Sequence, residues 1–424
     1  MKNFYLLAVV VLFLVSCQKD DETFVPQCSV AINSSANNLT LNSATLTWDD
    51  MNNNGSTDSA TYTIEYGLTG FAQGTGTDAT SSITTVTLNN LLPNTTYDYY
   101  IQTICSTNNP SLFSEVKSFT TLAPFVVMDF MPTLSEMNLF QGNLSDLSPS
   151  PYSFEYALNS QLYTDYALKQ RFIVLPTGAT MRYVNDALPD FPDNTVVVKT
   201  FYYNNDDRDV SLGKQIIETR VMIKKNGVWE FGDYIWNESQ TEATLDPNGS
   251  TLPVTWIDAS GTAQSINYKI PSQDNCFTCH QSNSQPTLIG PKLRSMNFDI
   301  NGANQLQKFI TEGRLVNAPV PSSIGVLPNW EDQSLSDEVR SRAYMDVNCA
   351  HCHSAGGFHN VNYFEALNLN FETSFIDSHL YEERESIIPR ILSSIEEYSM
   401  PYLGVTTPHT EAVDLIVTYL QSLD

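Results

Sequence analysis

Two five-residue segments of the chain combine cysteine and histidine at a spacing that can do chemistry. Residues 276–280 read Cys-Phe-Thr-Cys-His, and residues 349–353 read Cys-Ala-His-Cys-His. The pattern C-x-x-C-H is the one by which haem of the c type is attached to protein. Two thiols three positions apart can form thioethers with two vinyl groups on one porphyrin edge, and the following histidine can bind the iron. We therefore predict two covalent haem c groups, held by Cys276, Cys279, Cys349 and Cys352.

The same cysteines could instead hold zinc or form a dithiol redox pair. Zinc sites built from two C-x-x-C pairs usually place the pairs roughly 15–20 residues apart. Cys279 and Cys349 are about 70 positions apart in this chain. Zinc also has no need of a histidine directly after the second cysteine in both copies. These differences favour haem over zinc or a redox dithiol.

The histidine that ends each motif, His280 or His353, is the expected proximal ligand of an iron. Met400 precedes a proline about 47 positions after His353, ahead of a predicted terminal helix. This arrangement resembles that of class I cytochromes c, which carry their distal sulfur ligand there. For the first iron the nearest methionine is Met296, about 16 positions after His280, a short distance for a loop that must cross the porphyrin. The alternatives left open for that iron are Met345, His359, His379, His409 and an iron that binds only water.

A short segment after the first motif bears on the tautomer of its histidine. Residues 290–293 read Gly-Pro-Lys-Leu and are similar to the Gly-Pro-x-Leu of class I cytochromes c. The resemblance implies that the carbonyl of Pro291 accepts the proton on the far ring nitrogen of His280. A contact of this kind orients a ligating histidine and raises its basicity.

The first residues of the chain predict export. Residues 5–15 form an apolar run after Met1-Lys2-Asn3, which suits a secretory signal and is shorter than the roughly 20 apolar residues of a membrane-spanning helix. Residues 14–17 read Leu-Val-Ser-Cys and resemble a bacterial lipobox, which implies cleavage before Cys17 and lipid on that cysteine. We therefore expect a signal peptide at 1–16 and a tether at 17–24. These would anchor the protein at the outer membrane, facing the periplasm or the cell surface.

The composition narrows the range of partners. The 424 residues carry a formal charge of −26, and a surface this acidic repels nucleic acid and anionic lipid. It favours a basic electron carrier as redox partner, although the acidity could equally serve solubility alone. Among the 7 cysteines, Cys28 and Cys105 are left over once lipid and haem are assigned. We expect them to form a disulfide, as suits an oxidising compartment.

Residues 25–122 predict a small β-sandwich. Short alternating runs, separated by turn residues, recur at residues 44–48, 62–66, 85–88 and 97–105. Residues 92–97, Leu-Pro-Asn-Thr-Thr-Tyr, resemble the tyrosine corner of fibronectin type III domains, and residues 116–121 resemble their closing strand. The resemblance implies a fibronectin type III-like domain, which could serve as a spacer, a docking module or a passive fold.

The middle of the chain predicts a proline-rich linker at 123–151 and a second all-β domain at 152–270. Runs rich in valine, isoleucine and aromatic residues fill this second domain. Asn226-Gly227 predicts a two-residue type I′ turn. The two hairpins expected join residues 214–225 to 228–236 and residues 254–257 to 265–270.

Residues 271–424 predict a mainly α-helical, cytochrome c-like region that carries both motifs. Helices are expected at 302–313, 336–348, 385–395 and 410–423. The span from about 134 to 424 resembles a family of diheme c-type cytochromes of bacterial envelopes. The stretches that carry the resemblance are residues 163–171, 218–220, 234–237, 348–353 and 400–401. The resemblance implies haem binding and electron transfer, and it specifies no substrate.

The sequence as a whole therefore predicts a membrane-anchored diheme cytochrome that transfers electrons to or from a redox protein. The 70-residue spacing of the motifs predicts that both haems lie in one unit, close enough for electrons to pass between them. Two alternatives of different classes stay open. One is a diheme peroxidase or oxidase whose first iron is open to peroxide. The other is a surface binding protein in which haem is secondary.

Overall fold

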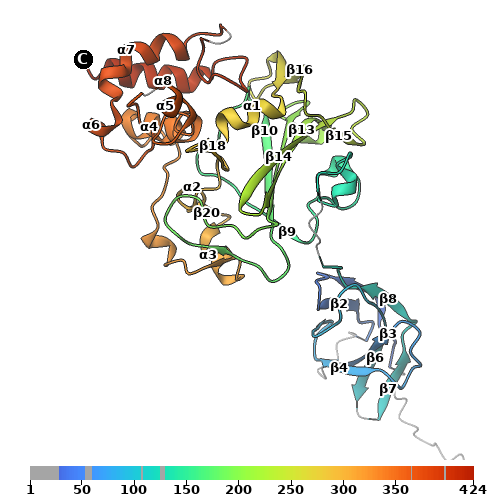
Figure 1. Ribbon diagram of the computed structural model, residues 1–424. Coiled ribbons are helices and arrows are strands. Elements are labelled where there is room, and N and C mark those ends of the chain that lie inside the picture. Colours follow the sequence, from blue (N-terminus) through green and yellow to red (C-terminus); the bar gives the residue numbers. More distant parts are fainter. Residues whose placement is uncertain (1–27, 53–59, 107, 125–128, 364, 396–397) are drawn as a thin grey trace, which may run out of the picture. The chain divides into compact units, whose positions relative to one another are not determined.

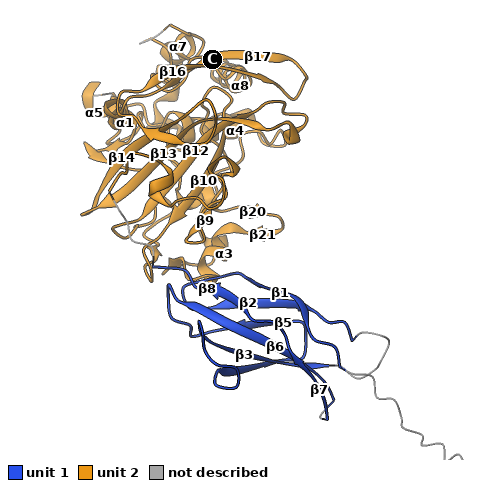
Figure 2. Cartoon of the chain, turned by 90° about the vertical axis from the view of Figure 1, so that its right-hand side faces the viewer, with its two compact units in different colours: residues 1–124 blue, residues 125–424 orange. Residues whose placement is uncertain are grey.

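The computed structural model of the protein describes residues 28–52, 60–106, 108–124, 129–363, 365–395 and 398–424, and the chain forms two units, residues 1–124 and 125–424 (Figure 2). The signal peptide and tether predicted for residues 1–24, with Cys17, lie outside the described residues. Among the residues that are described, no helix is long and apolar enough to cross a membrane.

The first unit is a sandwich of two antiparallel sheets, as its alternating runs predict. One sheet has the strand order β1-β2-β5; the other has the order β4-β3-β6-β7, with β8 also paired to β6. Alternate residues such as Leu46, Ile64 and Ile101 are fully buried in its core. The strands are β1 (Ile32–Asn37), β2 (Ala44–Asp49), β3 (Thr61–Leu68), β4 (Thr77–Ser81), β5 (Thr85–Leu88), β6 (Thr96–Ser106), β7 (Asn109–Phe113) and β8 (Lys117–Thr120).

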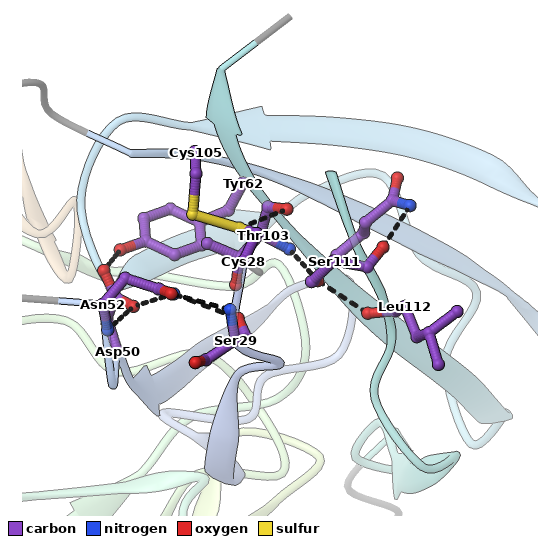
Figure 3. The surroundings of a disulfide bond; sticks show 10 residues. Cys28, Ser29, Asp50, Asn52, Tyr62, Thr103, Cys105, Ser111 and Leu112 are labelled. Carbon is purple, nitrogen blue, oxygen red and sulfur yellow. Dashed lines mark hydrogen bonds between the residues drawn. A yellow bond between two sulfur atoms is a disulfide. The ribbon is translucent and has the colours of Figure 1, made fainter. Parts of the chain in front are cut away.

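Two local features fix this sandwich. The hydroxyl oxygen of Tyr97 accepts a hydrogen bond from the backbone N–H of Leu92 at 2.9 Å, which is the contact that defines a tyrosine corner. Cys28 and Cys105, the pair expected from the sequence, form a disulfide that lies beside the ring of Tyr62 (Figure 3). The bond closes a loop across a sequence separation of 77 residues, and such a disulfide typically stabilises a domain by about 2–4 kcal/mol.

The second unit is built on a six-stranded antiparallel sheet with the order β15-β14-β13-β12-β10-β9. The predicted turn joins β13 to β14, since Asn226 and Gly227 have φ angles of 50° and 80°, the left-handed values that a type I′ turn needs. The strands are β9 (Ser153–Glu155), β10 (Leu168–Val174), β12 (Val196–Asn204), β13 (Lys214–Lys225), β14 (Val228–Trp236) and β15 (Ala243–Leu245).

One face of this sheet is covered by the segment predicted to be a linker. Leu134, Met137 and Leu147 are buried there against Val198 and Ile223 of the sheet. The segment carries two short 3-10 turns, η1 (Ser135–Met137) and η2 (Leu144–Asp146). Its prolines interrupt regular structure, but its apolar side chains still bury on the sheet, so most of residues 129–151 belong to the second unit.

The other face of the sheet carries the segments around the motifs. Sheet residues such as Met222 and Phe231 share one hydrophobic cluster with Leu293 and Leu306 of the C-terminal region. The parts predicted as separate domains, 152–270 and 271–424, therefore have a common core. Strands β16 (Ser250–Ile257) and β17 (Ala263–Ile270) form the second predicted hairpin, in which Val254 pairs with Ile266.

The helices follow the hairpin, and Figure 1 shows α4 to α8 gathered at the C-terminal end of the chain. They are α1 (Gln273–Cys279), α2 (Leu293–Met296), α3 (Gln305–Thr311), α4 (Asp337–Asn348), α5 (Phe358–Tyr363), α6 (Phe375–Ser378), α7 (Leu380–Ile391) and α8 (Thr410–Gln421), with the 3-10 turns η3 (Val210–Leu212) and η4 (Pro321–Ser323). Short two-residue strands complete the unit: β11 (Met181–Arg182) with β22 (Leu315–Val316), β18 (Gln281–Ser282) with β19 (Gln285–Pro286), and β20 (Asp299–Ile300) with β21 (Ala303–Asn304).

Candidate functional site

The first motif lies in a short helix that directly follows strand β17. Ser272 caps helix α1 together with Asn275, because each side chain accepts a hydrogen bond from the other residue's backbone N–H. The motif occupies the last turn of the helix, where the backbone N–H of His280 donates to the carbonyl of Cys276 at 2.8 Å. One helical turn therefore presents both thiols and the histidine together.

The ring of His280 is fixed by a backbone carbonyl. Its Nδ1 lies 3.1 Å from the carbonyl oxygen of Thr287, so Nδ1 carries the proton and Nε2 has a free lone pair. The prediction that the carbonyl of Pro291 makes this contact is corrected, because strands β18 and β19 turn the chain back at Thr287 first. The ring also packs on Phe231, with centroids 4.9 Å apart. Burial lowers the pKa of His280 to about 3, so the ring is neutral at pH 7.

The second motif follows helix α4. Ser336 caps the helix by accepting the backbone N–H of Val339, and Cys349 ends it. The side-chain oxygen of Asn348 accepts the backbone N–H of Tyr163 at 2.7 Å. This contact joins the motif to the segment that precedes strand β10.

The ring of His353 is fixed by a carboxylate that the sequence did not indicate. Its Nδ1 lies 3.0 Å from Oε2 of Glu365, and Nδ1 of His359 lies 2.7 Å from the same oxygen. The two imidazole rings are 4.6 Å apart. Burial lowers the pKa of His353. The arrangement repeats that of the first motif, in that an acceptor holds Nδ1 and Nε2 is left for another partner.

The two motifs contact each other, although they are far apart in sequence. The backbone N–H of Asn283 donates to the carbonyl of Gly356 at 2.7 Å, and a Cβ on Gly356 would lie 2.8 Å from the Asn283 side chain. Ligand atoms of Cys279, His351 and Cys352 all lie within 4.8 Å of one another. A hydrogen bond from the Cys352 thiol lowers the pKa of Cys279.

The other two motif thiols are partly buried and protonated. Burial raises the pKa of Cys276 to about 11 and that of Cys349 to about 12. Both are therefore neutral thiols at pH 7.

A buried carboxylate locks the segments that carry the motifs. Asp346 of α4 accepts from Lys292 at 2.9 Å, from Arg294 at 2.6 Å and from the backbone N–H of Phe371 at 3.0 Å. Arg294 also pairs with Glu372. Burial alone would raise the pKa of Asp346, but the two cations outweigh it and hold that pKa below its usual value. The chain after the first motif is thereby fixed to the helix before the second.

A cavity of about 80 Å³ opens between the sheet and the motifs. Pro401, Leu403, Gly404 and Val405 line one side of it. The motifs contribute Cys276, Cys279, His280 and His351, and strands β12 to β14 contribute Lys199, Arg220, Met222 and Asp233.

The methionines predicted as iron ligands lie in different surroundings. Met296 is fully buried in the hydrophobic cluster with Leu293 and Leu306. The methionine that lines the cavity beside His280 is Met222. Met400 is partly buried against the same hydrophobic cluster as Cys349. It lines a second cavity, of about 200 Å³, which shares most of residues 401–405 with the first.

The comparisons with known proteins concern the first unit. The fibronectin type III domain family matches residues 26–117. This part of the chain is a fibronectin type III domain. A β-sandwich protein redesigned by computer is 30% identical, over 23% of this chain and 98% of that one, with a TM-score of 0.19. The domain of human fibronectin type III domain containing protein 3 is 19% identical, over 24% of this chain and 93% of that one, with a TM-score of 0.21. A search of curated proteins found no match.

The fibronectin type III domain and the motifs occupy different units. The matched residues end before residue 125, where the second unit begins. The domain holds the disulfide and the tyrosine corner, whereas both C-x-x-C-H segments and the sheet that faces them belong to residues 125–424.

Proposed function

We propose that the protein is an exported, lipid-anchored diheme c-type cytochrome that transfers electrons in the cell envelope. In this proposal Cys276, Cys279 and His280 hold one haem, and a second is held by the matching residues Cys349, Cys352 and His353. The observation that carries it is the repeated environment of the two histidines. Each has Nδ1 on an acceptor, at 3.1 Å and 3.0 Å, and each keeps Nε2 for a metal.

The residues present fit the group that the motifs imply. Haem, when bound, supplies a reversible one-electron couple at its iron. Each motif brings two neutral or hydrogen-bonded thiols and one neutral imidazole, and buried cations lie opposite the first motif. The cavity of about 80 Å³ is smaller than the roughly 300–1,000 Å³ of typical sites for large ligands. The fit to haem therefore rests on the thiols and imidazoles of the motifs and not on the volume of this cavity.

The chain offers one methionine sulfur as a distal ligand for each proposed haem iron. Met400 stays the proposed distal ligand of the second iron, since it packs on the cluster that Cys349 also contacts. For the first iron we propose Met222 in place of Met296, because Met222 lines the cavity that contains His280. A thioether opposite histidine favours Fe(II) and raises the potential.

The contact between the segments that carry the motifs supports the proposal of electron transfer. Asn283 and Gly356 hydrogen bond at 2.7 Å, so haems attached to the two segments would be neighbours within one unit. The charge of −26 suits a basic redox partner. In this proposal residues 271–424 with the underlying sheet form a cytochrome c-like electron carrier, and the fibronectin type III domain spaces it from the lipid on Cys17.

A metal other than iron is the second candidate, and one observation favours it. Cys279, His351 and Cys352 bring three ligand atoms within 4.8 Å of one another, and the lowered pKa of Cys279 suits a thiolate ligand. Such a site would join the two motifs and leave Cys276 and Cys349 without a role.

Mass and metal content of the mature protein separate these functions. The protein is produced in a host that matures c-type cytochromes, then denatured and extracted with acidic solvent before mass spectrometry. Retention of two haem masses supports the proposal, and loss of one in the C276S/C279S variant assigns the first site. The C28S/C105S variant is the control and should keep both haems. A polypeptide mass without haem, together with one equivalent of zinc in the metal analysis, would overturn the haem proposal.

A further inference from the structure

Three cationic side chains stand side by side on the sheet face that looks toward the first motif. In the register of the sheet Arg171 of β10 pairs with Lys199 of β12, and Lys199 pairs with Arg220 of β13. Residues directly opposite each other on adjacent strands point to the same face. Arg171 and Lys199 are only 4% and 5% exposed. Like charges in such positions repel each other and destabilise the sheet, so the row needs an anion.

In the described part of the chain, carboxylates form ion pairs with only one end of this row. Arg220 pairs with Glu218 at 2.6 Å and lies 3.7 Å from Asp233. Arg171 has two long contacts, of 3.4 Å, to the Gln161 side chain, and its buried Nε has no hydrogen-bond partner. Among the residues that the structure describes, Lys199 has no hydrogen bond or ion pair, and its ammonium lies 5.7 Å from the ring of Phe201.

The row also borders the places where a ligand would lie. Lys199 and Arg220 line the cavity that contains Cys276 and His280. Arg171 lines a different cavity of the same unit, of about 720 Å³. Burial, followed by repulsion from Arg171 and Arg220, lowers the pKa of Lys199 to about 7, and the attraction of Glu218 does not offset these effects.

We propose that Lys199 and Arg171 form a carboxylate-binding site, and that on the mature protein its ligands are the two propionates of the first haem. The proposal rests on the function proposed above. Guanidinium binds a carboxylate through two parallel hydrogen bonds, and ammonium binds it as a point charge. A small free carboxylate from solution is the other source of the same chemistry.

Substitution of Lys199 in the mature full-length protein tests the site. Loss of a positive charge near an iron favours the oxidised form. If propionates fill the site, K199M therefore lowers one of the two haem midpoint potentials and leaves the other unchanged. K199R restores the lowered potential. Acetate then gives no saturable heat in calorimetry, because the site is already filled. The control is K225M, which removes a cation at the end of the adjacent strand β13, where Lys225 pairs with Glu230 at 3.0 Å.

The two sources of carboxylate give different results. If a free carboxylate is the ligand, acetate binds the unsubstituted protein saturably, and K199M weakens this binding at least tenfold while K225M does not. If the protein contains haem and K199M changes neither a midpoint potential nor acetate binding, the carboxylate-site inference is wrong and the proposed function is unaffected. Protein without haem overturns the proposed function, and acetate titration of that protein still decides whether the cationic row binds carboxylate.

Discussion

The buried carboxylate of Asp346 gives the sharpest test of how the motifs are held together. Its side chain is 1% exposed and accepts from Lys292 and Arg294. Replacing it with asparagine keeps the shape and the acceptor for the backbone N–H of Phe371, and it removes the charge that neutralises two cations. Removing one partner of a buried ion pair costs roughly 3–5 kcal/mol.

The surroundings of Asp346 place the expected loss at the lower end of that range. Arg294 keeps Glu372 as a partner, and the Lys292 side chain is 24% exposed. We therefore expect D346N to lower the free energy of unfolding of the second unit by about 3 kcal/mol. The matched control is D337N on the same helix. Asp337 is 53% exposed and pairs with Arg340 at 3.5 Å, and such surface pairs contribute about 0.3–0.5 kcal/mol.

Urea unfolding followed by tryptophan fluorescence measures both variants. The second unit contains four of the 5 tryptophans, and Trp48 reports on the fibronectin type III domain, whose transition should not change. The stabilisation by Asp346 also depends on pH, with a definite sign. The pKa of Asp346 is lowered in the folded protein, so its stabilisation is present above the usual carboxyl pKa, roughly 4. This stabilisation is lost as the pH falls through the lowered pKa that Asp346 has in the folded protein.

The gap between the wild type and D346N should accordingly be full at pH 7 and shrink below about pH 4. A D346N variant that loses no more stability than D337N at pH 7 would refute the claim that this carboxylate locks the motif segments. So would a gap that widens in acid.

Three further predictions concern other residues. Replacing Cys105 with serine should lower the stability of the fibronectin type III domain by about 2–4 kcal/mol in urea unfolding, with haem content unchanged. E365Q removes the negative charge of the carboxylate that contacts Nδ1 of His353. It should raise one midpoint potential relative to wild type in potentiometric titration, because an anionic acceptor makes the ligand more basic. M222L should convert one haem to a high-spin absorption spectrum, whereas M296L should change stability and leave both spectra alone; the reverse pattern would restore Met296 as the ligand.

Features set by neighbouring residues could be predicted from the sequence. Asn226-Gly227 marks its turn because both residues tolerate left-handed φ. The tyrosine corner is equally local, since Leu92 and Tyr97 are five positions apart. The C-x-x-C-H spacing likewise places both thiols on one turn of α1. In each case the chemistry is complete within a few residues, so no knowledge of the fold is needed.

Features that depend on strand register could not be predicted. Arg171, Lys199 and Arg220 stand at spacings with no meaning until β10, β12 and β13 are aligned. The acceptor for His280 depends on how tightly the chain turns back after it, and both Thr287 and Pro291 are within reach by sequence alone. The segment 129–151 has the prolines of a linker, and only the sheet beside it gives its apolar side chains somewhere to bury.

The segment before β10 explains why a sheet belongs to this site. Tyr163 donates its backbone N–H to Asn348, next to the second motif, at 2.7 Å. Two residues on, Asp165 accepts the backbone N–H groups of Thr406 at 2.8 Å and Thr407 at 3.1 Å, which fixes the loop that follows Met400. The chain then enters β10, which carries Arg171 in the cationic row. One short stretch thus sets the positions of the second motif, the methionine loop and the charged face together, so these parts can keep their mutual geometry even though they lie far apart in sequence.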